Sequence, residues 1–356
     1  MRGSSRPEAR IGGDRRANSP VDDTGAGGTG ARDGDRRLRV LSWHVHGSWQ
    51  HSFVQGRHEY LLPTLPERGP WGLGRADRPW GPNAVEVPAA ELREAEVDVV
   101  VLQRPEELGL VERWLGRRPG IDVPAVYVQH NTPNEGAATT EHVLSERGDI
   151  TVVHVTDFNR LMWDCGEAPT EVIGHGIVDP GPLYEGDLAR AVAVINEPVR
   201  RGRVAGGDLL PHFCAAAPVD VFGIKASQMR IDAGPGRHEL VGGADLRLDE
   251  LHRQMARRRV YVHPARWTSL GLSLLEAMHL AMPVAVVAAT EAASFPQEVG
   301  VVSCDPGALV AGVRELIEDR EQAVAAGKAA REYALANFGL EDFLRRWDAL
   351  LARVAA

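Results

Sequence analysis

From Leu38 onward, short apolar runs alternate with stretches of helical periodicity. Several runs are continuously apolar, which is typical of parallel strands covered on both faces. The pattern therefore predicts an α/β protein in which strands and helices follow one another. The expected strands are 38–43, 84–87, 97–102, 125–129, 151–155 and 171–173, and then 191–195, 219–222, 239–241, 260–262, 284–288 and 301–303.

Helical stretches separate these runs and close the chain. They are expected at 108–115, 157–164, 207–216, 248–256, 270–281 and 306–318, with a helical tail over 321–354 broken at 337–339. Two successive series of strands and helices predict two Rossmann-like domains that face a cleft. We expect domains at 38–185 and 186–335 and a last segment, 336–356. The stretch 63–82, rich in Gly, Pro and Arg, is expected to be a long loop that shapes the choice of acceptor.

Composition and charge narrow the class of protein. The 356 residues carry 40 basic and 49 acidic side chains, a formal charge of −9, which argues against nucleic acid as the main partner. No apolar run approaches the roughly 18 residues of a membrane span. Three cysteines without a CxxC pair exclude a zinc knuckle and favour a reducing, cytoplasmic location. Residues 1–37 carry few apolar side chains, chiefly Met1, Ile11 and Val21, and are expected to form a disordered tail.

The densest chemical signal is the segment 263–287, with the pattern of strand, loop, helix and strand. Thr268 or Ser269 can cap the helix, and Gly271 permits close approach of a ligand to the backbone. Glu276 is the acidic residue in an otherwise apolar helix. A buried, unpaired carboxylate costs several kcal/mol. Glu276 therefore either binds donors such as a vicinal diol or faces solvent or a salt bridge, and the sequence leaves both open.

This segment resembles the signature of retaining GT-B glycosyltransferases, the large family of glycogen, sucrose and mannosyl transferases. A turn at 174–177 and the C-terminal helix extend the resemblance over about residues 38–353. It implies a GT-B fold with the donor on the second domain and a C-terminal helix that crosses back to the first. The residues that match the signature are Pro264, Gly271, Leu272, Leu275, Glu276, Ala277, Met278, Pro283 and Val284.

The resemblance also implies roles in donor binding. Glu276 would hold the donor ribose as the second glutamate of the family's E-x7-E pair, and Gly271 and Leu272 would offer backbone amides. Thr268 stands where the family has the first glutamate, which contacts the transferred sugar. Ser269 and Leu270 complete the expected donor loop.

A basic segment follows the first strand of the second domain. Arg200, Arg201 and Arg203 lie where the family places cations against the leaving diphosphate, and Lys225 is a further candidate. Arginine suits bidentate phosphate contact, and a cation there would stabilise the leaving group. A solvated basic turn is the alternative, and the sequence leaves the essential arginine open.

In the first domain, candidate ligands follow two strands. Gly47 resembles the family's glycine turn that lets donor phosphate approach, and His44 and His46 could bind an acceptor. His130 and Asn131 end another strand, where open α/β sheets bind ligands. The resemblance gives His130 a catalytic role in contacting the sugar. A structural role is the alternative for each histidine.

The leading hypothesis is a metal-independent, retaining glycosyltransferase without a cofactor. It would move a sugar from a nucleotide-diphosphate sugar to the hydroxyl of a glycan, lipid or small molecule. A protein that binds nucleotide sugar without turnover, as a sensor or partner subunit, is the second hypothesis, and a sugar-nucleotide epimerase is the third. The nucleotide base, the sugar, the acceptor and the oligomeric state stay open.

Overall fold

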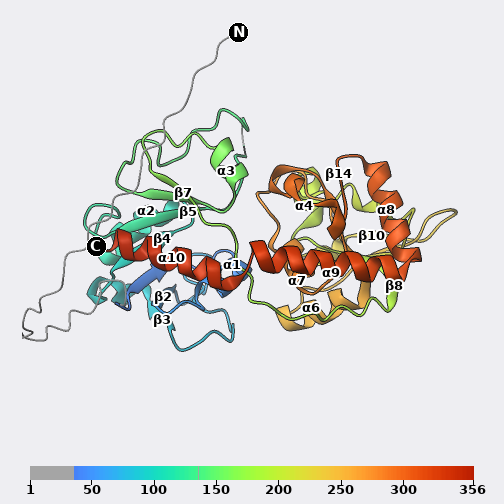
Figure 1. Cartoon of the computed structure of the whole chain (residues 1–356). Helices are drawn as coiled ribbons and strands as arrows, with labels where there is room; N and C mark the ends of the chain where they lie inside the picture. The colour runs from blue at the N-terminus through green and yellow to red at the C-terminus, as the bar shows by residue number, and fades with distance from the viewer. Residues whose placement is uncertain (1–35, 135) are drawn as a thin grey trace, which may run out of the picture. The chain divides into compact units, whose positions relative to one another are not determined.

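The computed structural model describes residues 36–134 and 136–356, so nearly all of the tail predicted at 1–37 lies outside the described residues. Arg37–Ala356 form one compact unit. Within this unit the described residues build two seven-stranded sheets, each at the centre of one lobe (Figure 1). The α/β fold class with two parallel-sheet lobes is therefore confirmed.

The first lobe is built on a parallel sheet with the order β3-β2-β1-β4-β5-β6-β7. Its central strands are fully buried and apolar, as strands covered on both faces must be. The strands are β1 (Arg39–Ser42), β2 (Glu59–Thr64), β3 (Ala84–Pro88), β4 (Val99–Leu102), β5 (Ala125–Gln129), β6 (Thr151–His154) and β7 (Thr170–Val172). The helices are α1 (Gly47–Phe53), η2 (Ala89–Glu94), α2 (Glu106–Leu115) and α3 (Asp157–Met162).

The second lobe has the order β10-β11-β9-β8-β12-β13-β14, parallel except for the edge strand β10. Its strands are β8 (Leu188–Val194), β9 (Val219–Phe222), β10 (Arg230–Ile231), β11 (Leu240–Gly242), β12 (Arg258–His263), β13 (Val284–Val287) and β14 (Gly300–Ser303). Its helices are α4 (Pro198–Ala205), α5 (Leu210–Phe213), η3 (Ala226–Gln228), α6 (Leu248–Arg257), α7 (Leu272–His279), η4 (Thr290–Ser294), η5 (Gln297–Val299), α8 (Pro306–Glu318) and α9 (Arg320–Asn337).

The last two helices connect the lobes. Helix α9 packs Ala330 and Ala334 into the core of the second lobe. The chain turns at Phe338 and Gly339, and α10 (Leu340–Val354) then packs against the sheet of the first lobe (Figure 1). A pattern of Phe343, Trp347, Leu350 and Leu351 gives α10 one apolar face, so the sequence dictates which side of the helix is buried.

Several segments differ from the sequence-based expectation. Strand β2 was missed because Glu59 and Pro63 interrupt its apolar pattern. The loop expected at 63–82 therefore begins only after Thr64. The helix expected over 207–216 shrinks to α5, and the basic turn 198–205 is the helix α4 with a kink at Gly202. Proline and glycine in both segments limit regular helix formation.

The sheet orders place the functional region. In each sheet the first strand, β1 or β8, lies where the strand order reverses, beside β4 or β12. Open α/β sheets bind ligands outside the carboxyl ends of such strands. Residues 43–48 and 103–104 follow β1 and β4, and residues 195–201 and 264–271 follow β8 and β12.

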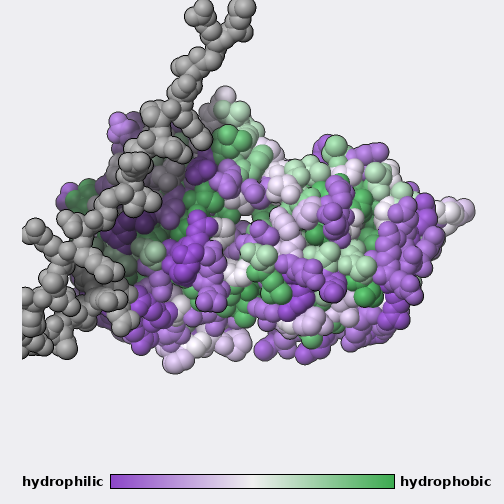
Figure 2. All heavy atoms as spheres, viewed as in Figure 1, coloured by the Kyte–Doolittle hydropathy of each residue, from purple (hydrophilic) through white to green (hydrophobic). Residues whose placement is uncertain are grey.

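The surface gives no sign of a membrane span. The face drawn in Figure 2 mixes hydrophilic and hydrophobic residues, and hydrophilic ones cover the end near α8. Within residues 36–134 and 136–356, no helix combines the length and the hydropathy that crossing a bilayer requires.

We expect Trp347→Ala to lower the free energy of unfolding by about 3–5 kcal/mol, because it removes a fully buried aromatic side chain. Trp347 packs edge-on against Trp49 and Phe53, with ring centroids 5.7 and 5.1 Å away. Chemical denaturation measures the loss, and Glu341→Ala on the exposed face of α10 is the matched control. A loss below 1 kcal/mol would contradict the packing of α10 described above.

Candidate active site

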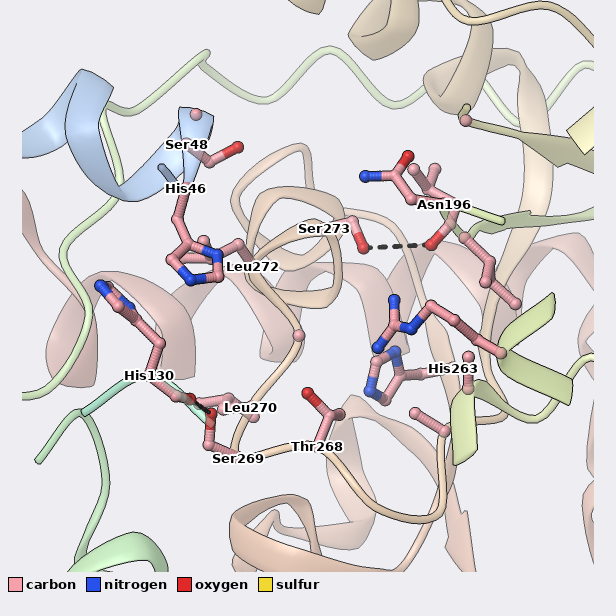
Figure 3. A pocket seen from close by; sticks show the side chains of 18 of the residues that line it. His46, Ser48, His130, Asn196, His263, Thr268, Ser269, Leu270, Leu272 and Ser273 are labelled. Atoms are coloured by element: carbon pink, nitrogen blue, oxygen red, sulfur yellow. Dashed lines mark hydrogen bonds between the residues drawn. The ribbon is translucent and has the colours of Figure 1, made fainter. Parts of the chain in front are cut away.

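A cavity of about 810 Å³ opens between the carboxyl ends of the two sheets, lined by residues from both lobes (Figure 3). Most of the residues predicted for a donor or acceptor site line it. His44, Arg203 and Lys225 do not. The predicted residues at the cavity are His46, Gly47, His130, Asn131, Arg200, Arg201, Thr268, Ser269, Leu270, Gly271, Leu272 and Glu276.

The carboxylate of Glu197 holds two of the predicted cations. Its Oε1 accepts from Lys225 Nζ at 2.7 Å, and its Oε2 accepts from Arg200 Nε at 2.8 Å. These bonds lower the pKa of Glu197 to about 2. The side chain of Lys225 is 57% exposed in this pair, and the residue does not line the cavity. Arg200 reaches the cavity already paired.

Arg203 is also occupied elsewhere. Its Nη1 donates to Asp208 at 3.2 Å, and Asp208 accepts two further bonds from Arg266. The side chain of Arg203 is 78% exposed, and the residue does not line the cavity. It lies on the outward face of α4, beyond the kink at Gly202.

Arg201 differs from its neighbours. It lines the cavity half-buried, and within the described residues its side chain has no hydrogen bond or ion pair. Burial, and then the charge of Arg200, lower its pKa from the ordinary value. Arg201 therefore brings an uncompensated positive charge to the cavity, as a bound anion would require.

Glu276 lies on α7 with its side chain 6% exposed, at the edge of the cavity. The imidazole of His252 on α6 faces this carboxylate, with its Nε2 3.6 Å from Oε2. That separation is too long for a hydrogen bond. Glu276 is therefore neither solvated nor tied into a close salt bridge. Its carboxylate keeps capacity to accept from a ligand's hydroxyl groups.

Gly271 is required by a side chain of the protein itself. A Cβ at this position would lie 2.4 Å from Cε1 of His263, a residue that ends β12 and lines the cavity (Figure 3). The sequence analysis missed His263 because it reads as the last residue of an apolar strand. Missed in the same way, His252 lies on the buried face of α6.

The donor loop contacts the first lobe. Ser269 Oγ donates to the carbonyl of His130 (Figure 3), and Trp267 Nε1 donates to the carbonyl of Pro133 at 2.7 Å. Thr268, between them, lines the cavity. A third bond runs from the amide of Phe158 to Oε2 of Glu291 at 3.0 Å. Ser269 therefore holds the two lobes together through its side chain.

His130 lies at the centre of a buried aromatic group. Its Nε2 is 3.0 Å from Oε1 of Gln103, and Gln103 uses its Nε2 to donate to the carbonyl of Trp43. Nε2 of His130 is therefore the donor, which leaves Nδ1 as an acceptor. The ring lies tilted against that of His46, at 4.1 Å between centroids, and meets Trp49 edge-on at 5.1 Å.

The histidines around the cavity are neutral at physiological pH. Burial lowers the pKa of His46 to about 4, of His175 to about 3 and of His263 to about 4. The pKa of His130 is lowered too, by burial and then by His46. These rings can therefore exchange hydrogen bonds with a ligand without adding charge.

His44 lies outside the cavity. Its Nδ1 is 3.1 Å from the carbonyl oxygen of Gly74, to which it must donate, and its ring lies 4.7 Å from that of Trp80. These contacts give His44 a role in holding the loop after β2. Asn131 lines the cavity. No cluster of three or more candidate metal ligands occurs within residues 36–134 and 136–356.

Comparison with solved structures identifies the architecture. Sucrose-phosphate synthase from Thermosynechococcus elongatus has a TM-score of 0.62 at 15% identity, over 89% of this chain and 99% of that one. HepE from Anabaena, in complex with UDP and glucose, has a TM-score of 0.65 at 12% identity, over 89% and 100%. TarM from S. aureus has a TM-score of 0.57 at 13% identity; 71% of this chain covers about half, 55%, of TarM.

These likenesses define the fold as that of GT-B glycosyltransferases. Residues 235–333, which include the donor loop and Glu276, match the family "Glycosyl transferases group 1". The fold is therefore that of the GT-B glycosyltransferases that the sequence predicts, and residues 235–333 are similar to the group 1 family. No curated protein matches the chain significantly.

We expect Gly271→Ala to lower the free energy of unfolding by about 1–3 kcal/mol, because the new methyl group would collide with the His263 ring. Gly109→Ala is the matched control, since a Cβ there meets no atom within 4 Å, and alanine in a helix is favourable. Urea denaturation compares the two variants. Equal stability of both would contradict the close packing of Gly271 and His263.

We expect acid to destabilise the protein as the pH falls from about 6.5 to 4. The pKa of His263 is depressed in the folded state, so the unfolded chain binds the proton more tightly, and the stability present above pH 6.5 is lost on acidification. His263→Gln should reduce this loss by about 3 kcal/mol. The exposed His238→Gln is the control, and an unchanged pH slope in His263→Gln would contradict the expectation.

Proposed function

We propose that the protein is a retaining glycosyltransferase that moves a sugar from a nucleoside-diphosphate sugar to an acceptor hydroxyl. The observation that carries this proposal is the pair Arg201 and Glu276 at the donor end of one cavity. Arg201 offers a half-buried positive charge without a partner among the described residues, and Glu276 offers a carboxylate with little competition. A diphosphate and a ribose diol need these two kinds of group.

The chemistry assigned to the site is a same-face displacement. The bond between the anomeric carbon and the diphosphate oxygen breaks while the acceptor oxygen bonds to that carbon. The acceptor proton moves to an oxygen of the leaving diphosphate, so charge and atoms balance. Arg201, with the paired Arg200 beside it, would stabilise the negative charge that develops on the leaving group.

The remaining donor contacts follow from the same residues. Glu276 would accept from the ribose hydroxyls, and the backbone of Gly271 and Leu272 would contact the sugar or its phosphates. Nδ1 of the neutral His130 would accept a hydrogen bond from a hydroxyl of the transferred sugar. The described side chains would supply these steps without a metal or cofactor.

Relatives in fold support the class of donor. Structures of HepE carry UDP-glucose or UDP with glucose, and one of TarM carries UDP. We therefore propose a nucleoside-diphosphate sugar, with uridine as the first base to test. The thiols of Cys165, Cys214 and Cys304 are free, and we infer a reducing, cytoplasmic location from them.

Binding without turnover is the second candidate function, and Thr268 favours it. The family places a glutamate there, and threonine brings no charge to the transferred sugar. Transfer and slow donor hydrolysis separate the two functions, since a sensor or partner subunit would bind the donor and release no free nucleotide. An epimerase would convert the sugar without an acceptor.

We expect UDP or another nucleoside diphosphate to raise the melting temperature, since a ligand at 100 times its Kd stabilises by about 2.7 kcal/mol. A thermal-shift screen of UDP, GDP, ADP and their sugar conjugates measures this. Arg201→Gln should weaken binding about ten-fold or more, and Glu276→Gln should also weaken it.

Arg203→Gln is the matched control, because this arginine lies on the same helix but outside the cavity. Its binding should equal that of the wild type. If no nucleotide raises the melting temperature, or if Arg203→Gln weakens binding as much as Arg201→Gln, the assigned donor site is wrong.

A further inference from the structure

A second arginine lines the cavity from the opposite lobe. Arg78 belongs to the loop that joins β2 to β3 and is half-buried. Its backbone is hydrogen-bonded, but within residues 36–134 and 136–356 its guanidinium has no hydrogen bond or ion pair. The loop expected to shape the choice of acceptor thus delivers a positive charge into the cavity.

The loop is held in place by hydrogen bonds around Arg78. The carbonyl of Arg78 accepts from the amide of Trp80 at 2.8 Å and from Arg75 Nη2 at 3.3 Å. The Trp80 indole donates to His51 Nδ1 at 3.0 Å, and the amide of Arg75 donates to Glu86 at 2.8 Å. These contacts fix the backbone at Arg78 before any ligand arrives, which lowers the cost of ordering the site.

Gly47 makes room for the guanidinium. A Cβ at Gly47 would lie 3.0 Å from Nη2 of Arg78, tighter than ordinary van der Waals contact. The space that a side chain would fill at the start of α1 is therefore occupied by the charged end of Arg78. Gly47, predicted to admit a donor phosphate, here admits an arginine of its own lobe.

Among the described residues of the first lobe that line the cavity, none carries a negative charge to balance Arg78. These residues are neutral apart from this arginine: Val45, His46, Gly47, Ser48, His130, Asn131, Thr132, Asn134 and His175. The carboxylates among the described lining residues, Asp245 and Glu276, belong to the second lobe. An arginine in such a setting is suited to a planar oxyanion, which it can bind with two hydrogen bonds.

We propose that Arg78 binds an oxyanion, a phosphate or a carboxylate, on the acceptor, so that the acceptor class is anionic. This inference rests on the proposed function. The donor's diphosphate already has Arg201 in the second lobe, and the acceptor enters from the first lobe, whose cation is Arg78. In this assignment Arg201 binds the anionic donor at the wall of the second lobe, and Arg78 binds the anionic acceptor at the wall of the first lobe.

The test separates the two arginines by the ligand that each one controls. Isothermal titration measures UDP binding, and then the binding of inorganic phosphate, glycerol 3-phosphate and glucose 6-phosphate to the UDP-saturated protein at constant ionic strength. Glycerol and glucose serve as neutral counterparts. The proteins are the wild type, Arg78→Gln, Arg78→Lys, Arg201→Gln and Arg203→Gln.

We expect the anions to bind the wild type at least ten-fold more tightly than their neutral counterparts. Arg78→Gln should abolish this preference and leave UDP affinity within two-fold, while Arg78→Lys should retain part of it. Arg201→Gln should instead weaken the binding of UDP, and Arg203→Gln should change neither the affinity for UDP nor the preference for anions. With the anionic acceptors, Arg78→Gln should raise KM more than it lowers kcat.

Two results would overturn the assignment. If Arg78→Gln weakens the binding of UDP as strongly as Arg201→Gln does, Arg78 binds the donor diphosphate. If the wild type shows no preference for the anions, or keeps it in Arg78→Gln, the first lobe has no oxyanion site at Arg78. If the proposed function is wrong, no nucleotide binds to the protein. The anions are then titrated into the protein without UDP.

Discussion

The pairing of charges around α4 is the constraint on which the candidate site depends. The segment after β8 carries three arginines, and two carboxylates of the same lobe pair with two of them. Glu197 holds Arg200 together with Lys225, and Asp208 holds Arg203. An exposed pair of this kind contributes little to stability. The consequence of these pairs concerns the site. Of the three arginines, Arg201 faces the cavity without a partner among the described residues.

The same logic applies to the two glycines of the cavity. Both were expected to let a ligand approach the backbone, and both also make room for a side chain of the protein. Gly271 accommodates the ring of His263, and Gly47 accommodates the guanidinium of Arg78. A missing side chain at a binding site therefore positions a neighbouring group as well as admitting a ligand. Two polar groups at the cavity, the His263 ring and the Arg78 guanidinium, thus lie where they do because the neighbouring residue is glycine.

Local patterns predicted much of the architecture, and tertiary contacts decided the rest. Strands β5 and β9 and helix α8 were predicted with their observed bounds, because continuous apolar runs and a clear cap at Asp305 leave little choice. Strand β2 was missed because its pattern is broken by Pro63. The roles of Lys225 and Arg203 could not be predicted, since their partners' positions depend on the fold. Arg78 gave no signal at all, because a loop without periodicity does not say where its side chains point.

The hydrogen bonds that join the lobes affect how a ligand reaches the cavity. Ser269 to His130, Trp267 to Pro133 and Phe158 to Glu291 all cross from one lobe to the other. Opening the cavity by moving the lobes apart breaks these three bonds, at a cost on the order of 1.5–4.5 kcal/mol. A molecule that contacts only one wall makes no contact that depends on the lobes being closed. A molecule that contacts both walls adds its own contacts to the closed form, so it favours closure more than a molecule that contacts one wall.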